Sequence, residues 1–204
     1  MVMNSAFSAL LQVALLGGVP FFAYFIWQRR RHGRTFHETA RRAGLQLGEP
    51  RYLAISLLFS LAGVVGLMVW PPPLEPLTRQ GSMYRHFVAL GFGAPAIAVA
   101  FLYGVVQTGF TEELLFRGLL AGSLSRRMSV AWATLVQAFI FLLPHLAILL
   151  VAPELWGILP RVFLVMILLG WLRIKSGSIL GSWLIHASGN VTMALLVAVR
   201  TVAS

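Results

Sequence analysis

The chain has 204 residues, of which 58% are hydrophobic and 11% charged, and its mean hydropathy is +0.83. Soluble domains are about 45–50% apolar and about 25% charged, so this composition excludes an ordinary soluble protein and indicates an all-α, polytopic membrane protein. The absence of cysteine excludes disulfides, thiolate metal ligands and a cysteine nucleophile. The net charge of +10 does not indicate nucleic-acid binding, because the basic residues lie between apolar runs, where they suit anionic lipid headgroups.

Six apolar runs are long enough to cross a bilayer, which takes about 20 residues per helix. The first run is not typical of a signal peptide, because its basic cluster follows the apolar stretch instead of preceding it. We therefore expect a single membrane domain over residues 1–204. Its six transmembrane helices are expected at Ala6–Trp27, Tyr52–Trp70, Phe92–Leu120, Val130–Val151, Trp156–Leu172 and Ile179–Val199.

The connections between these runs predict the topology. "TFHETARRAGLQLG", after the first run, is typical of a short amphipathic helix on the cytoplasmic surface, with Phe36, Leu45 and Leu47 against lipid. "WPPPLEP", after the second, cannot continue a helix and predicts a loop. Alternating loops place 12 of the 16 basic residues, Arg117 among them, on one side, so the positive-inside rule predicts both termini outside the cytoplasm. Because the basic residues are nearly all arginine, we expect a bacterial inner-membrane protein.

Ionisable residues inside the apolar runs are candidate functional residues, because each costs about 2.5–3.5 kcal/mol near the bilayer centre. In "GFTEELLFRGLL", Glu113 and Arg117 lie four residues apart on one helix face, a spacing that favours an ion pair. Glu112 points about 100° away from Glu113 on an α-helix. We expect Glu112 to be buried without an ion-pair partner, which suits a group that takes and gives protons. Arg161, beside Pro160, is expected to be structural or to face headgroups.

Three further polar residues lie in the fourth and sixth runs. His145 follows Pro144, which loosens a helix, and His186 and Asn190 share a helix face, where such a pair can also be a helix–helix hydrogen bond. Together with Glu112 they supply a base, a proton shuttle and oxyanion donors, as a hydrolytic site requires. On straight helices His145 would lie about 22 Å from the cytoplasmic end and Glu112 about 12 Å. A tilt, a kink at Pro144 or a later start of the fourth helix is therefore expected to account for the difference.

The same residues resemble the motifs of the CPBP family of CAAX proteases and bacteriocin-processing enzymes, also called Abi proteins. "EELLFR", "FLLPH" and "HASGN" match the family's EExxxR, FxxxH and HxxxN motifs in order, within about residues 92–199. The resemblance implies an intramembrane glutamate-dependent endopeptidase that cleaves a membrane-associated protein or peptide without a cofactor. The roles it implies are general base for Glu112, water binding for His145, oxyanion stabilisation for His186 and Asn190, and support for Glu113 and Arg117.

Two other functions fit the same residues. Glu112, His145 and His186 could form the three-ligand zinc site of a membrane hydrolase, although the chain has no HExxH motif. A non-enzymatic protein, such as a bacteriocin-immunity protein, a binding protein or a proton-coupled carrier that uses Glu112 as a relay, would also need an intramembrane carboxylate.

Overall fold

The computed structural model describes residues 2–200, and the regular elements in that range are all helices. Six helical runs are long and apolar enough to span a membrane, which confirms the predicted all-α architecture. The elements are α1 (Val2–Gln12), η1 (Val13–Gly18), α2 (Val19–His32), α3 (Phe36–Arg42), α4 (Pro50–Val69), α5 (Leu74–Leu77), α6 (Arg85–Leu90), α7 (Ala94–Phe101), η2 (Leu102–Phe110), η3 (Glu113–Ala121), α8 (Gly122–Leu124), α9 (Val130–His145), α10 (Ile148–Val151), η4 (Pro153–Ile158), α11 (Leu159–Ser176) and α12 (Leu180–Arg200).

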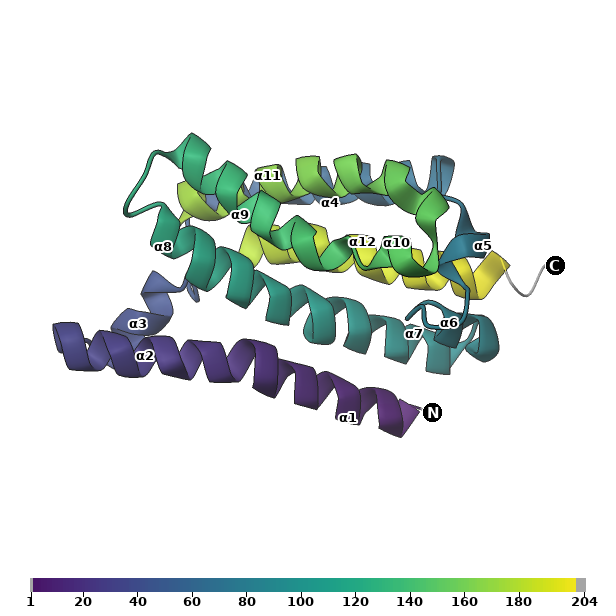
Figure 1. Cartoon of the computed structure of the whole chain (residues 1–204), viewed down its shortest axis with the longest axis horizontal. Coiled ribbons are helices and arrows are strands. Elements are labelled where there is room, and N and C mark those ends of the chain that lie inside the picture. Colours follow the sequence, from purple (N-terminus) through teal and green to yellow (C-terminus); the bar gives the residue numbers. More distant parts are fainter. Residues whose placement is uncertain (1, 201–204) are drawn as a thin grey trace.

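The six spans run side by side as one bundle, and the N-terminal end of α1 and the C-terminal end of α12 lie at the same end of it (Figure 1). The opposite end holds α3 and the α8–α9 loop (Figure 1), where Arg126 donates to the hydroxyl of Tyr24 at 3.0 Å. Arg173, at the end of α11, donates to the carbonyl of Arg42 at 2.9 Å. This gathering of basic residues away from both termini agrees with the expected topology, while the orientation in a membrane stays a prediction.

Helix α12 forms the centre of the bundle, where it packs against α4, α7, η2 and α11. Its contact with α7 is made by small side chains, since Ala96, Ala100, Ala194 and Ala198 are all fully buried. Lipid tails are as apolar as the helices, so membrane helices associate through close packing, and small residues permit that closeness. Contacts on several sides hold α12, and with it the expected site residues of the sixth span.

The third span departs from a regular α-helix. We expected one α-helix over Phe92–Leu120, whereas the structure has α7 followed by two π-helical segments, η2 and η3. In a π-helix the backbone bonds run between residues five apart, and such segments are frequent at functional sites. Thr108 and Thr111 repeat this spacing with their side chains, because each hydroxyl donates to the carbonyl five residues earlier, at 3.0 and 3.2 Å. The sequence pattern did not predict this backbone.

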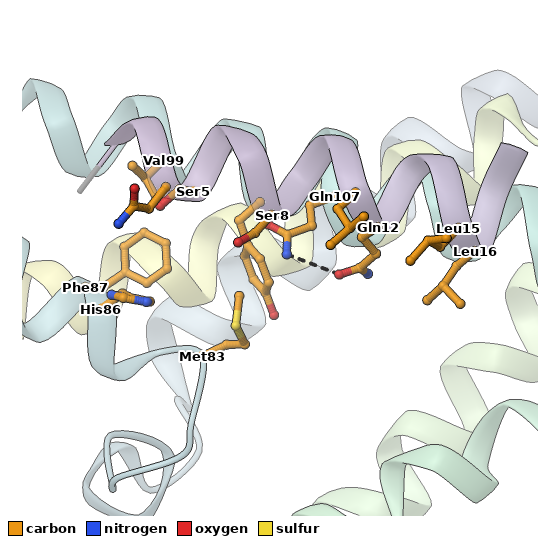
Figure 2. Close-up of a pocket in the computed structure, with 13 residues that line it drawn as sticks. Ser5, Ser8, Gln12, Leu15, Leu16, Met83, His86, Phe87, Val99 and Gln107 are labelled. Atoms are coloured by element: carbon orange, nitrogen blue, oxygen red, sulfur yellow. Dashed lines mark hydrogen bonds between the residues drawn. The ribbon is translucent and has the colours of Figure 1, made fainter.

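The first span packs along the third over most of its length. It is also interrupted by a π-helical segment, η1, and Gln107 of η2 donates to the side chain of Gln12 at 3.1 Å. A cavity of about 540 Å³ lies beside this contact, with Ser8, Gln12 and Gln107 among the residues that line it (Figure 2). None of the expected site residues lines this cavity.

The expected amphipathic helix is present in shortened form as α3. Thr35 caps its first turn in a capping box, in which Glu38 N–H donates to Thr35 Oγ1 at 3.2 Å and Thr35 N–H donates to Glu38 Oε2 at 2.7 Å. Because the Thr35 N–H bonds the charged form of the carboxylate, it lowers the pKa of Glu38.

The lipid-facing residues expected around α3 are correct at two positions and wrong at one. Phe36 and Leu47 are exposed, whereas Leu45 packs against the buried side chains of Phe21 and Leu114. The chain ends α3 and turns at Gly44, which has a φ of 80°, so that Leu45 faces the bundle.

The fourth span is broken near its proline. We expected one helix over Val130–Val151, but α9 ends at His145, directly after Pro144, and the short α10 follows. Proline removes a backbone donor and crowds the preceding turn, so Pro144 weakens the last turn of α9. The break lies after His145 in the chain, so it does not lower His145 towards the depth expected of Glu112.

Gly104 permits the close approach of η2 to α12. A Cβ atom at this position would lie 2.7 Å from Val191 Cγ2 and 2.8 Å from Val191 N, closer than real Cβ contacts. We predict that Gly104→Ala lowers the free energy of unfolding by about 1–3 kcal/mol, the usual cost of overpacking. Thermal unfolding in detergent, followed by circular dichroism, measures the effect. Gly189→Ala is the matched control on α12, because a Cβ at Gly189 meets open space; equal melting temperatures for the two variants would contradict the prediction.

Candidate active site

A buried ion pair lies at the centre of the candidate site. Glu113 Oε1 is 3.1 Å from Arg117 Nη1, and both side chains are 0% exposed. This confirms the ion pair expected from the four-residue spacing. Arg117 had been counted with the cytoplasmic basic residues, which is wrong, because its guanidinium lies inside the bundle over the ring of Phe141, 4.5 Å from its centroid, and contacts Met166 Sδ. The pair therefore joins the third span to α9 and α11.

His186 makes the second contact of the Glu113 carboxylate. Its Nδ1 lies 3.0 Å from Glu113 Oε1, across the interface between α12 and η3. An ionised carboxylate only accepts hydrogen bonds, so Nδ1 carries the proton and donates it, and Nε2 is left to accept or bind a proton. Sequence reasoning had paired His186 only with Asn190 and missed this bond, because nothing in the spacing of one helix reports its partner on another.

Glu112 faces the other nitrogen of the same ring. Glu112 Oε2 lies 3.8 Å from His186 Nε2, which is too long for a hydrogen bond but close enough for a charge–charge interaction. The side chain of Glu112 is 21% exposed, whereas that of Glu113 is completely buried. The expectation that the two carboxylates face different surroundings is therefore correct, but Glu112 is not fully buried, and it has an ion-pair partner only when His186 is protonated.

Phe141 separates the two histidines. Its ring stacks on His145, with centroids 4.4 Å apart, and meets the ring of His186 edge-on at 6.1 Å. The side chain of Phe141 is 1% exposed, so the aromatic position of the FxxxH motif lies in the core beside Arg117. No role had been assigned to Phe141 from the sequence, although the motif itself contained the signal.

His145 does not join the carboxylate cluster in this structure. Its Nδ1 lies 2.9 Å from the carbonyl of Phe141, one turn earlier on α9, and therefore donates to it. Among residues 2–200, His145 has no hydrogen bond or ion pair with Glu112, His186 or Asn190. The rings of His145 and His186 both contact Phe141, and the catalytic role of His145 stays a prediction.

Asn190 is placed one turn beyond His186 on α12, as expected. Its Nδ2 donates to the hydroxyl of Thr108 on η2 at 2.8 Å. Both polar residues of the HxxxN motif thus make bonds to the third span, His186 to Glu113 and Asn190 to Thr108. Sequence reasoning had allowed for such helix–helix bonds without naming their partners.

The side chains named for a zinc site do not form one here. Within the described part of the chain, no group of three or more histidine and acidic side chains is placed to hold a metal ion. Glu112 and His186 are neighbours, but the third proposed ligand, His145, stacks on Phe141 instead. A three-ligand site would therefore require His145 to leave that position.

Tyr84 was not singled out from the sequence and lies within the electrostatic range of Glu112. Burial raises the pKa of the Tyr84 hydroxyl to about 12, and the negative charge of Glu112 acts in the same direction. Its ring meets Tyr103 of η2 edge-on, with centroids 6.1 Å apart. A protonated phenol thus lies in the loop before α6, against the first turn of η2.

Comparison with known protein families identifies the region that carries these residues. Residues 93–192 match the model of a family described as type II CAAX prenyl endopeptidase Rce1-like. Over these residues the chain is similar to the Rce1-like family. The Rce1-like region contains all of the expected site residues and agrees with the resemblance to the CPBP family, and it supports a membrane endopeptidase. No curated protein and no solved structure matched the chain.

The two adjacent glutamates of the Rce1-like region are expected to respond differently to substitution. Glu113→Ala leaves Arg117 charged, buried and without its carboxylate, which should lower the free energy of unfolding by about 3–5 kcal/mol. Glu112→Ala removes a partly exposed carboxylate and should leave folding close to wild type. Protein level in the membrane and thermal unfolding of the purified variants measure both effects. Indistinguishable stability of the two variants would show that the Glu113–Arg117 pair does not stabilise the fold as predicted.

Proposed function

We propose that the chain is an intramembrane endopeptidase in which Glu112 is the general base. The observation that carries this proposal is a series of contacts from Glu112 to His186, from His186 to Glu113, and from Glu113 to Arg117. In this series the imidazole lies between two carboxylates that differ in exposure. The buried carboxylate is occupied by a cation and an N–H donor, whereas the partly exposed one is free to meet water and substrate. In this proposal Glu112 is the base, His186 is the group oriented by Glu113, and Glu113 with Arg117 forms the structural ion pair.

The chemistry follows from these positions. Glu112 takes a proton from water as the water oxygen bonds to the carbonyl carbon of the peptide, and the carbonyl oxygen becomes an oxyanion. The carbon–nitrogen bond then breaks, and Glu112 gives the proton to the leaving nitrogen, which yields an acid and an amine. His186 is held by Glu113 with Nε2 towards Glu112, so that once protonated it can donate to the oxyanion. The remaining N–H of Asn190 is proposed as the second donor.

His145 is proposed for a supporting part only. In the stacked position its ring nitrogen is bonded within α9, so it reaches the water only by turning away from Phe141. The residues proposed for the hydrolysis need neither a metal nor an organic cofactor. The first two spans would form the wall of the bundle, and residues 1–204 would act as a single domain.

The proposed substrate is a membrane-associated protein or peptide. The family description names CAAX prenyl endopeptidases, so a prenylated CAAX peptide is the first probe, and the same peptide without its lipid is the second. We propose a bacterial inner membrane as the location, with both termini outside the cytoplasm, because the basic residues gather at the opposite end of the bundle. Partners other than substrate and lipid headgroups are not needed for this function.

Replacement of Glu112 tests the proposed base. Glu112→Gln keeps the size and polarity of the side chain but cannot take a proton, so cleavage of the peptide probes should fall by at least about 100-fold. Cells that make this variant should accumulate an uncleaved precursor in their membrane proteome. The matched control is Glu154→Gln, which replaces an acidic residue in the 3₁₀-helix η4 that pairs with Arg79. Full activity of Glu112→Gln would refute the mechanism, and an unchanged phenotype of both Glu112→Gln and His186→Ala would indicate a binding protein.

Metal removal separates the glutamate mechanism from a zinc hydrolase. Purified protein dialysed against a strong chelator should keep its rate of peptide cleavage, because the proposed water is activated by Glu112. The measurement is the initial rate before dialysis, after dialysis and after addition of zinc. Loss of activity on dialysis with recovery on zinc addition would favour the metal site and overturn the mechanism.

A further inference from the structure

We propose that Thr108 is a positioning residue that fixes the orientation of the Asn190 side-chain amide. The inference rests on the proposed function, since it concerns the oxyanion donor assigned to Asn190. Thr108 lies in none of the three motifs found in the sequence. Thr108 lies on η2, four residues before Glu112, and is 9% exposed.

The direction of each hydrogen bond sets the orientation of the amide. A threonine hydroxyl has one proton, and Thr108 donates it to the carbonyl of Tyr103 at 3.0 Å. With that proton committed, the hydroxyl oxygen can only accept from Asn190, so the neighbour at 2.8 Å is Nδ2 and not Oδ1. Rotation of the amide by 180° would place two acceptors against each other and lose the bond. The second N–H of Nδ2 is then available for the substrate oxyanion.

The segment that carries Thr108 is held on two sides. Gln107 donates to the side chain of Gln12 on the first span at 3.1 Å (Figure 2). On the other side Gly104 leaves room for α12, since a Cβ there would lie 3.2 Å from Asn190 Cβ and still closer to Val191. These contacts set the rotation of η2 and bring the hydroxyl of Thr108 within reach of Asn190.

The π-helical backbone supplies the acceptor for the Thr108 proton. The bond to Tyr103 spans five residues, which is the spacing of the π-helix and not that of an α-helix. The expected effect on catalysis follows from this geometry. Without the hydroxyl the amide can turn, and Oδ1 in place of N–H would repel the developing negative charge, so the rate should fall while substrate binding changes little.

Nuclear magnetic resonance tests the orientation without an activity assay. The sequence has two asparagines, Asn4 and Asn190, so labelling with ¹⁵N-asparagine gives two side-chain amide groups. In the wild type, one Asn190 amide proton should be shifted and slowed in solvent exchange by its bond to Thr108. Thr108→Ser should keep this signature, and Thr108→Val should abolish it while the Asn4 signal stays unchanged. An Asn190 signal unaltered by Thr108→Val would overturn the inference.

Kinetics test the consequence with the prenylated CAAX peptide. Thr108→Val should lower kcat about tenfold at constant KM, less than the roughly 100-fold expected for Asn190→Ala as loss of an oxyanion donor. The double variant should be no slower than Asn190→Ala alone, because Thr108 acts through Asn190. Thr108→Ser should restore most of the rate. Independent, multiplicative effects in the double variant would overturn the proposed role.

A buried threonine elsewhere supplies the matched control. Thr134 of α9 is 4% exposed, and its hydroxyl also donates to a backbone carbonyl, that of Val130. Within residues 2–200 its hydroxyl accepts no side-chain hydrogen bond, since Gln137 donates to the backbone carbonyl of Thr134 instead. Thr134→Val should leave the Asn190 signal and kcat unchanged. If Thr108→Val does not accumulate in the membrane, Thr108→Ala removes the same hydroxyl without a new methyl group, and both readouts apply to it. A fully active Glu112→Gln would refute the proposed function, whereas an inactive Glu112→Gln with wild-type kinetics and amide signals in Thr108→Val would refute only this inference.

Discussion

The Glu113 carboxylate is the group on which the other parts of the site depend. It is completely buried, and such a charge is tolerated only if it is paired and hydrogen-bonded. Arg117 supplies the opposite charge from the same helix, and His186 supplies an N–H donor from α12. The need to satisfy this one carboxylate therefore aligns η3 with α12 and selects which nitrogen of His186 is presented to Glu112. Glu112, which is partly exposed, is the carboxylate that we propose as the general base.

The parts of this arrangement that lie within one helix could be predicted from the sequence, and those between helices could not. Glu113 and Arg117 are four residues apart, so their pairing follows from helix geometry alone. The bonds from His186 to Glu113 and from Asn190 to Thr108 depend on how α12 packs, and no spacing along the chain reports that. The six spans were predictable because length and apolarity decide them, whereas the break after His145 and the partial burial of Leu45 depend on local turns.

The π-helical segments are the feature of the fold that sequence patterns described least well. An apolar run of more than twenty residues satisfies the requirement of a membrane span whichever helix type it adopts, so hydropathy does not distinguish the types. In the π-helical segments of the third span, successive side chains are rotated by a different angle than in an α-helix. Bonds form between residues five apart, as at Thr108 and Thr111. Close contacts at Gly104 fit α12 to that surface. The positions of the motif residues therefore reflect the backbone type as well as their order in the chain.

The placement of Glu113 and Arg117 on one helical turn has a consequence for how the protein enters the bilayer. A membrane helix is inserted before it packs with its neighbours, and each unpaired charge at its centre opposes that transfer. Because the acid and the base of this pair belong to the same segment, they can neutralise each other while the third span is still alone in lipid. Only the bond to His186 has to wait for the sixth span. The Glu113–Arg117 pair can therefore form when the third span inserts, whereas the bond to His186 forms only when the sixth span packs against it.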